Sequence, residues 1–157
     1  MVYDVDGNLV KDEQYNIFCH QTNCKGVMGS GIAKQIRLKY PAVDSRNSDF
    51  CKTNPLGKIL VVRVGPERFC VNLYGQDDYG RQRDKVYTNY EALQKALDTL
   101  ADRLNNSSIP DSWKIGFPNR MSCGLGNANW TKIRTMIEGF ADKVRQDVYI
   151  VHWKENS

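Results

Sequence analysis

A glycine-rich turn between an apolar segment and a helical pattern is the feature that most constrains this chain. Ile17 and Phe18 lead into a polar stretch, and three glycines follow it, Gly26, Gly29 and Gly31. A strand, a glycine turn and a helix start present free backbone N–H groups and the positive end of a helix dipole to an anion. Glycine suits such a turn because the absence of a Cβ lets the backbone approach a ligand closely. The stretch therefore predicts a phosphate-binding site.

Length and composition restrict the classes of protein that this chain can belong to. Its 157 residues are enough for one domain that buries a core without disulfide or metal support. The net charge of +4 is mild and spread along the chain, which favours a solvated surface over a nucleic-acid groove. The five cysteines follow no disulfide pattern, so we expect reduced thiols and a cytoplasmic protein. No secretory signal and no apolar run of membrane-spanning length is visible, and we expect no membrane partner.

The order of apolar runs and helical patterns predicts an alternating α/β chain. Strands are expected at 2–5, 15–20, 58–64, 69–74, 113–118 and 148–152, with 58–64 and 69–74 forming a hairpin. Helices are expected at 31–39, after a capping box at 88–91, and after a cap at Asn129. Pro41 should end the first helix, and 42–57 should form an irregular surface excursion that can include a short helical turn. This order predicts one domain over 1–157, with a mixed sheet and helices on both of its faces.

A second turn of small residues, 122–127, also lies between a predicted strand and a predicted helix. Ligands of open α/β sheets gather at the carboxyl ends of the strands, so the two turns could grip one diphosphate from both sides. Either turn alone is equally well explained as a tight connection. A P-loop is excluded by the missing Gly-Lys-Ser/Thr ending. A Rossmann dehydrogenase is disfavoured by the missing third glycine of the dinucleotide fingerprint.

Three segments together resemble the macrodomain family: Asp-Gly-Asn-Leu-Val at 6–10, His-Gln-Thr-Asn-Cys-Lys-Gly-Val-Met-Gly-Ser-Gly-Ile-Ala at 20–33, and Ser-Cys-Gly-Leu-Gly-Asn-Ala-Asn-Trp at 122–130. The branch they resemble is that of the yeast-type ADP-ribose-1″-phosphate phosphatases and their bacterial and phage relatives. Similar patterns occur in terminal ADP-ribose glycohydrolases and in DNA-acting antitoxin macrodomains. The resemblance implies a three-layer α/β/α fold with a mixed, mostly parallel sheet. It also implies binding of ADP-ribose or its 1″-phosphate without a cofactor or metal, and we expect a monomer.

The resemblance also implies roles for individual residues. Asn8 and the backbone of Leu9 correspond to the adenine site, Asn23 to the distal ribose, and His20 with Asn23 to the catalytic position. Asn8 can equally form a turn after Asp6 and Gly7. The remaining implied contacts with ADP-ribose are Gln21, Gly26, Met28, Gly29, Ser30, Gly31, Ile32 and Ala33 around the first turn, Tyr74, Gly75 and Gln76 near the distal ribose, and Ser122, Cys123, Gly124, Leu125, Gly126 and Asn127 in the second turn. Tyr74 could equally belong to the core.

His20 is the main chemical candidate. An imidazole beside a terminal phosphate could donate a proton to the leaving sugar oxygen or activate water, although a structural hydrogen bond is the alternative. His152 is expected to be structural. Cys19, His20 and Cys24 lack a second ligand cluster with zinc-like spacing, so no metal site is predicted. Trp153 could stack on adenine but is left out of the predicted site.

Two other functions stay open beside the phosphatase. One is an ADP-ribosyl hydrolase that acts on a modified protein or nucleic acid. The resemblance argues against it, because the lysine and aspartate of that route have no counterpart at 73–76 or 126–129. A carboxylate could come from Asp77, Asp78 or Asp84, and the sequence selects none of them. The other function is a non-catalytic reader or sequestering protein for ADP-ribose, which the presence of His20 disfavours.

Overall fold

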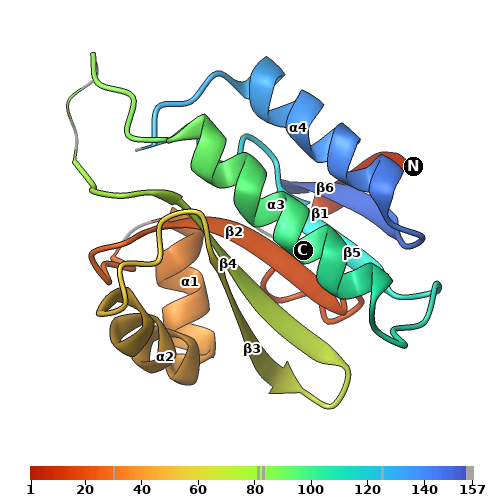
Figure 1. Cartoon of the computed structure of the whole chain (residues 1–157). Coiled ribbons are helices and arrows are strands. Elements are labelled where there is room, and N and C mark those ends of the chain that lie inside the picture. Colours follow the sequence, from red (N-terminus) through yellow and green to blue (C-terminus); the bar gives the residue numbers. More distant parts are fainter. Residues whose placement is uncertain (30, 81, 83, 125, 155–157) are drawn as a thin grey trace.

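A single six-stranded sheet organises the molecule, and the computed structural model describes residues 1–29, 31–80, 82, 84–124 and 126–154. Within these ranges the sheet order is β1-β6-β5-β2-β4-β3 (Figure 1). Strand β3 runs antiparallel to β4, and the other neighbouring pairs are parallel. The predicted mixed, mostly parallel sheet is confirmed. The strands are β1 Val2–Gly7, β2 Ile17–Asn23, β3 Ile59–Gly65, β4 Arg68–Gln76, β5 Lys114–Pro118 and β6 Asp147–Trp153, and the helices are α1 Gly31–Lys39, α2 Pro41–Cys51, α3 Tyr90–Asn105 and α4 Trp130–Lys143.

Helices cover both faces of the sheet, as predicted. Figure 1 shows α3 and α4 on one face and α1 and α2 on the other. Alternate residues of β2 point to opposite faces, so Cys19 packs in the core under α3 and α4, whereas Phe18 packs in the core under α1 and α2. The leucine stripe of α3, from Leu93 to Leu104, is buried in the first of these cores. The chain therefore forms three layers, α/β/α.

The segment after Pro41 corrects the sequence prediction. Pro41 does not lead into an irregular excursion but is the first residue of α2. The first helical position tolerates proline because its N–H would have no intrahelical acceptor. Val43 and Asn47, one helical turn apart, form the buried face of α2. Since that face includes an asparagine and the helix is otherwise mostly polar, hydrophobic periodicity gave no signal there.

The start of α3 also differs from the predicted capping box. The cap is Asn89, whose side chain accepts a hydrogen bond from the Ala92 N–H at 3.0 Å. The Thr88 hydroxyl instead lies 3.2 Å from the Gly126 carbonyl oxygen, to which it donates. The predicted cap at Asn129 of α4 is confirmed by its bond with the Lys132 N–H. No helix in the described ranges is both long and apolar enough to span a membrane.

The connection from β1 to β2 covers part of the sheet face that α1 and α2 leave open. Leu9, Val10 and Tyr15 of this connection are buried in the same core as Phe18. Gly116 of β5 makes room for Leu9 and Tyr15, because a Cβ at this position would collide with Leu9 Cδ1 and would lie 3.2 Å from the Tyr15 ring. The absence of a side chain on one strand thus lets the connection pack directly on the sheet.

Gly116→Ala should lower the free energy of unfolding by about 1–3 kcal/mol, because the added methyl overpacks a buried contact. The matched control is Gly139→Ala in α4, where a Cβ meets nothing within 4 Å. That change should raise stability by about 0.5–1 kcal/mol through helix propensity. Urea denaturation of both variants measures the difference. Equal stability of the two variants would contradict the packing described for Leu9.

Candidate functional site

A cleft of about 1210 Å³ lies at the carboxyl ends of the parallel strands. Its walls come from the ends of five strands: Asn8 follows β1, Asn23 ends β2, Gln76 ends β4, Pro118 ends β5 and Trp153 ends β6. The start of α1 completes the cleft. Because parallel pairing brings these strand ends to one edge, segments far apart in the sequence converge there.

Most of the predicted ligand-binding residues line this cleft. Both small-residue turns contribute to it, so the predicted pairing of the two turns around one space is present in the structure. Ser30 and Leu125 lie outside the described residues. The predicted residues that line the cleft are Asn8, Leu9, His20, Gln21, Asn23, Gly29, Gly31, Ile32, Ala33, Gln76, Ser122, Gly124 and Gly126.

Six predicted contact residues do not line the cleft. Tyr74 is buried beside α2, where its hydroxyl donates a hydrogen bond to Asn47 Oδ1 at 2.6 Å. Met28 belongs to the same core, and Gly75 is enclosed, since a Cβ there would lie 2.5 Å from Gln21 Oε1. Tyr74, Met28 and Gly75 are therefore enclosed by protein and do not reach the surface of the cleft. The six are Gly26, Met28, Tyr74, Gly75, Cys123 and Asn127.

Sequence reasoning did not include two large side chains of the cleft. Arg120 follows β5, and Trp153 ends β6 with 56% of its surface exposed. Among the described residues that line the cleft, Arg120 is the charged one, and no aspartate, glutamate or lysine joins it. The signal that could have found both is their position directly at or after the end of a predicted strand. Neither Asp77 nor Asp78 lines the cleft, and Asp84 does not either.

The other new lining residues are small, apolar or amide-bearing. They come from the same strand ends and loops as the predicted residues. The complete set of lining residues that the sequence did not assign is Val10, Thr22, Val27, Gln35, Tyr79, Gly80, Pro118, Asn119, Arg120, Met121, Val151 and Trp153.

His20 lies at the floor of the cleft and is completely buried. Its Nε2 is 2.6 Å from Asn72 Oδ1, and because that oxygen can only accept, Nε2 carries the proton. The Asn72 amide in turn donates to Asn47 Oδ1 at 3.3 Å, which fixes its orientation. His20 Nδ1 is therefore the acceptor nitrogen, and it has no hydrogen-bond partner among the described residues. Burial lowers the pKa of His20 to about 4, so the ring is neutral at pH 7.

The side chains of Asn8 and Asn23 both shape their own loops. Asn8 Oδ1 accepts hydrogen bonds from the N–H groups of the two residues at 10 and 11, at 3.2 and 3.1 Å. Asn23 Oδ1 accepts from Lys25 and Val27, and Asn23 Nδ2 donates to the Val27 carbonyl at 2.9 Å. The turn-forming role considered for Asn8 is thus present. Asn8 Nδ2 makes no hydrogen bond within the described part of the chain.

The second turn is fastened to the sheet through Thr88. Gln21 Nε2 donates to Thr88 Oγ1 at 2.9 Å, and the Thr88 hydroxyl and N–H both donate to the Gly126 carbonyl. Gly126 itself must be a glycine, since a Cβ there would lie 2.6 Å from the Ser122 carbonyl oxygen and 2.7 Å from Thr88 Oγ1. Strand β2 therefore positions the first and the second turn together.

His152, the second histidine, lies outside the cleft and takes part in an ion-pair cluster. His152 Nε2 lies 2.9 Å from Asp4 Oδ1, and Arg134 pairs with the same carboxylate. Hydrogen bonds from these two side chains hold the pKa of Asp4 well below its usual range. The described cysteines are free, and burial raises the pKa of Cys24 to about 11. No group of three or more His, Cys, Asp or Glu side chains in the described ranges is arranged to hold a metal ion.

No protein-family model matches the chain. Its sequence is similar to the ADP-ribose 1″-phosphate phosphatase of Saccharomyces cerevisiae, with 26% identity over 170 residues that cover 92% of this chain and 96% of the yeast protein. Its structure is similar to the macrodomain of Mycobacterium tuberculosis DarG, with a TM-score of 0.78 and 18% identity over 97% of both chains. The chain folds as a macrodomain. The fold that the sequence resemblance implied is thereby confirmed.

A further structure to which this chain is similar is that of Thermosipho africanus DarTG in complex with ADP-ribose. It has a TM-score of 0.72 and 16% identity, over 92% of this chain and 39% of that one. The fold of this chain is thus shared by proteins of low sequence identity to it.

The buried His20 should make this macrodomain less stable at mildly acidic pH. The unfolded chain protonates His20 below its ordinary pKa of 6.5, whereas the folded protein does so only near 4. The unfolded state then binds more protons, so the free energy of unfolding falls as the pH drops from 6.5 to 4, by about 3 kcal/mol from this group. His20→Gln keeps a donor for Asn72 and should lack this part of the pH dependence. Urea denaturation from pH 7.5 to 4 measures both proteins, and parallel curves would contradict a buried, neutral His20.

Proposed function

We propose that this macrodomain binds ADP-ribose in the cleft and hydrolyses ADP-ribose-1″-phosphate to ADP-ribose and phosphate. The observation that carries the proposal is the convergence of the two small-residue turns on one cleft at the carboxyl edge of the sheet. The similarity to the yeast ADP-ribose 1″-phosphate phosphatase supports the choice of substrate.

The diphosphate would bind to backbone N–H groups rather than to a metal. Gly31 begins α1, and the free N–H groups and positive dipole end of that helix favour an anion beside it. Gly124 and Gly126 bring a second stretch of backbone to the same space. Arg120 adds the charged side chain that the sequence prediction lacked. These groups together can donate hydrogen bonds to the two phosphates and offset part of their charge.

The two ends of ADP-ribose would lie at opposite ends of the cleft. Asn8 and Leu9 stand beside Trp153, since Gly7 pairs with Trp153 in the sheet. A half-exposed indole next to an amide with a free Nδ2 suits a purine base, which stacks and accepts hydrogen bonds. Asn23 and Gln76, at the ends of paired strands β2 and β4, would face the distal ribose.

The chemical step we propose uses His20 as a base. Since Nε2 donates to Asn72, the lone pair of Nδ1 can accept a proton from a water molecule that attacks the phosphorus. The bond between phosphorus and the sugar oxygen breaks, and that oxygen takes a proton from solvent. A neutral ring cannot serve as the proton donor, so the acid role considered from sequence is set aside.

Binding without catalysis is the second candidate, and two observations favour it. His20 has no exposed surface, and the described residues that line the cleft offer no carboxylate to assist it. A reader or sequestering protein for ADP-ribose needs neither an exposed histidine nor a carboxylate in the cleft. An ADP-ribosyl hydrolase acting on modified protein or nucleic acid has less support, because lysine and aspartate are both missing from the described lining.

Phosphate release from ADP-ribose-1″-phosphate, measured beside calorimetric ADP-ribose binding, separates these functions. His20→Gln should lower kcat by at least about 100-fold, the usual contribution of a general base, while the Kd for ADP-ribose stays within about twofold. His152→Gln is the matched control, since His152 does not line the cleft. Undiminished kcat in His20→Gln would contradict the role of His20. Tight binding by the wild-type protein with no phosphate release would establish the reader.

Gly124→Ala tests whether the backbone of the second turn contacts the ligand. A Cβ at Gly124 meets no protein atom within 4 Å, so the variant should keep its stability. Its methyl group would occupy space in the cleft, and we expect the affinity for ADP-ribose to fall by about tenfold or more. Gly139→Ala again serves as the control, because a Cβ at Gly139 also has no protein atom within 4 Å. Equal ADP-ribose affinity in all three proteins would show that the ligand does not approach Gly124.

A further inference from the structure

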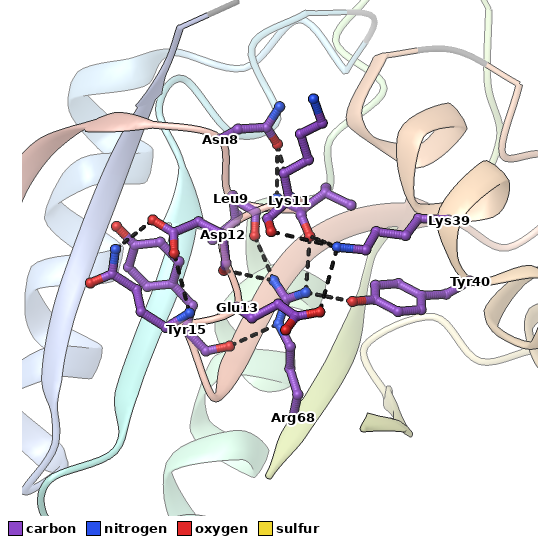
Figure 2. A network of polar contacts seen from close by, with 11 residues as sticks. Asn8, Leu9, Lys11, Asp12, Glu13, Tyr15, Lys39, Tyr40 and Arg68 are labelled. Carbon is purple, nitrogen blue, oxygen red and sulfur yellow. Dashed lines mark hydrogen bonds and ion pairs between the residues drawn. The ribbon is translucent and has the colours of Figure 1, made fainter. Parts of the chain in front are cut away.

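Arg68, the first residue of β4, is a buried cation that binds the connection between β1 and β2. Figure 2 shows its guanidinium surrounded by backbone oxygens of that connection. Nη2 donates to the carbonyls of Leu9 at 2.7 Å and Asp12 at 3.1 Å, Nη1 donates to Val10 at 2.9 Å, and Nε donates to Tyr15 at 3.1 Å. Only 5% of the Arg68 surface is exposed. One side chain thus satisfies four carbonyl groups of a single loop.

No carboxylate neutralises Arg68 within the part of the chain that the structure describes. Two aromatic rings instead make cation–π contacts with Arg68. The guanidinium carbon lies 4.3 Å from the centre of the Phe18 ring and 5.7 Å from that of Tyr40. The Tyr40 hydroxyl accepts a further hydrogen bond from Nη1 at 2.6 Å. A planar group with five donors meets these acceptors simultaneously, and a lysine ammonium cannot.

The connection that Arg68 holds forms one wall of the cleft. Asn8, Leu9 and Val10 line the cleft, whereas Arg68 does not. Lys39 of α1 adds a weaker contact to the same segment, at 3.3 Å from the Val10 carbonyl oxygen. The amide of Asp12 closes the loop on the Asn8 carbonyl at 2.8 Å. The wall therefore depends on a side chain that lies beneath it and never reaches its surface.

We propose that Arg68 is a positioning residue for the base end of the cleft. By fixing the carbonyls of Leu9 and Val10, it holds Asn8 and Leu9 where a purine base would bind. This inference rests on the proposed function, because that function places the base beside Asn8. Arg68 would therefore affect binding of the nucleobase and leave the phosphate and distal ribose end unchanged.

Arg68→Lys tests the proposal, with Arg63→Lys as its matched control. Arg63 is an exposed arginine on β3 that bonds only the carbonyls of Gly65 and Pro66 among the described residues. Affinity is measured for ADP-ribose and for ribose 5-phosphate, which lacks the base. Arg68→Lys should weaken ADP-ribose binding by about tenfold or more and change ribose 5-phosphate binding by less than about twofold. Equal weakening for both ligands, or none, would overturn the positioning role.

Arg68 and the loop carbonyls that it binds are called the clamp. Hydrogen exchange without ligand tests this clamp independently of the proposed function. In Arg68→Lys the Asp12 amide should exchange at least about tenfold faster, while amides of α3 keep their wild-type rates. Unchanged exchange at Asp12 would overturn the clamp. If the wild-type protein bound no adenosine nucleotide, the proposed function and the base-positioning role would both fail, and faster Asp12 exchange would still support the clamp itself.

Discussion

Parallel pairing around β2 is the constraint on which the site depends. Strand β2 pairs in parallel with β4 on one side and with β5 on the other, so the chain must return across the sheet after each of these strands. Strand β3 makes the return from β2 to β4, and helices α3 and α4 make the returns after β4 and β5. The carboxyl ends of the five parallel strands therefore lie at one edge, whereas the antiparallel β3 ends at the other. A cleft assembled this way needs no single continuous motif. The shared edge of the parallel strands also explains why residues separated by more than a hundred positions, such as Asn8 and Arg120, line one cleft.

Periodicity and turn chemistry were enough to predict most of the fold. The β-branched run of β3, the leucines of α3 and the glycine turn before α1 each carry a local signal, and each appears as expected. Helix α2 was not predicted because its buried face includes Asn47, whose partners are Tyr74 and Asn72 on a neighbouring strand. Buried polar contacts of this kind arise from tertiary structure, which hydrophobic patterning does not encode.

The candidate site was predictable in position but not in chemistry. Sequence order places His20 at a strand end, yet its protonation state depends on burial and on Asn72, fifty-two positions away. The roles of Arg68 and Thr88 depend likewise on contacts across the sheet. Tyr74, itself one of the predicted ribose contacts, lies in the core because side chains alternate along β4. Strand boundaries can be read locally, whereas the face that each end residue presents follows from the final register.

The bond network at Thr88 has an evolutionary consequence. Gln76 and Thr88 form an isolated antiparallel bridge, so the chain leaves the sheet and returns to it at adjacent points. The second turn is attached at Thr88 and at the last residues of the excursion, because Asn127 Nδ2 donates to the Lys85 carbonyl and the Tyr87 N–H donates to the Gly126 carbonyl. The segment between Gln76 and Lys85 can therefore change in length and composition with only a slowly growing entropic cost, while the turn stays in place. Since Tyr79 and Gly80 of this segment line the cleft, such a change would alter one part of its rim and leave the two turns where they are.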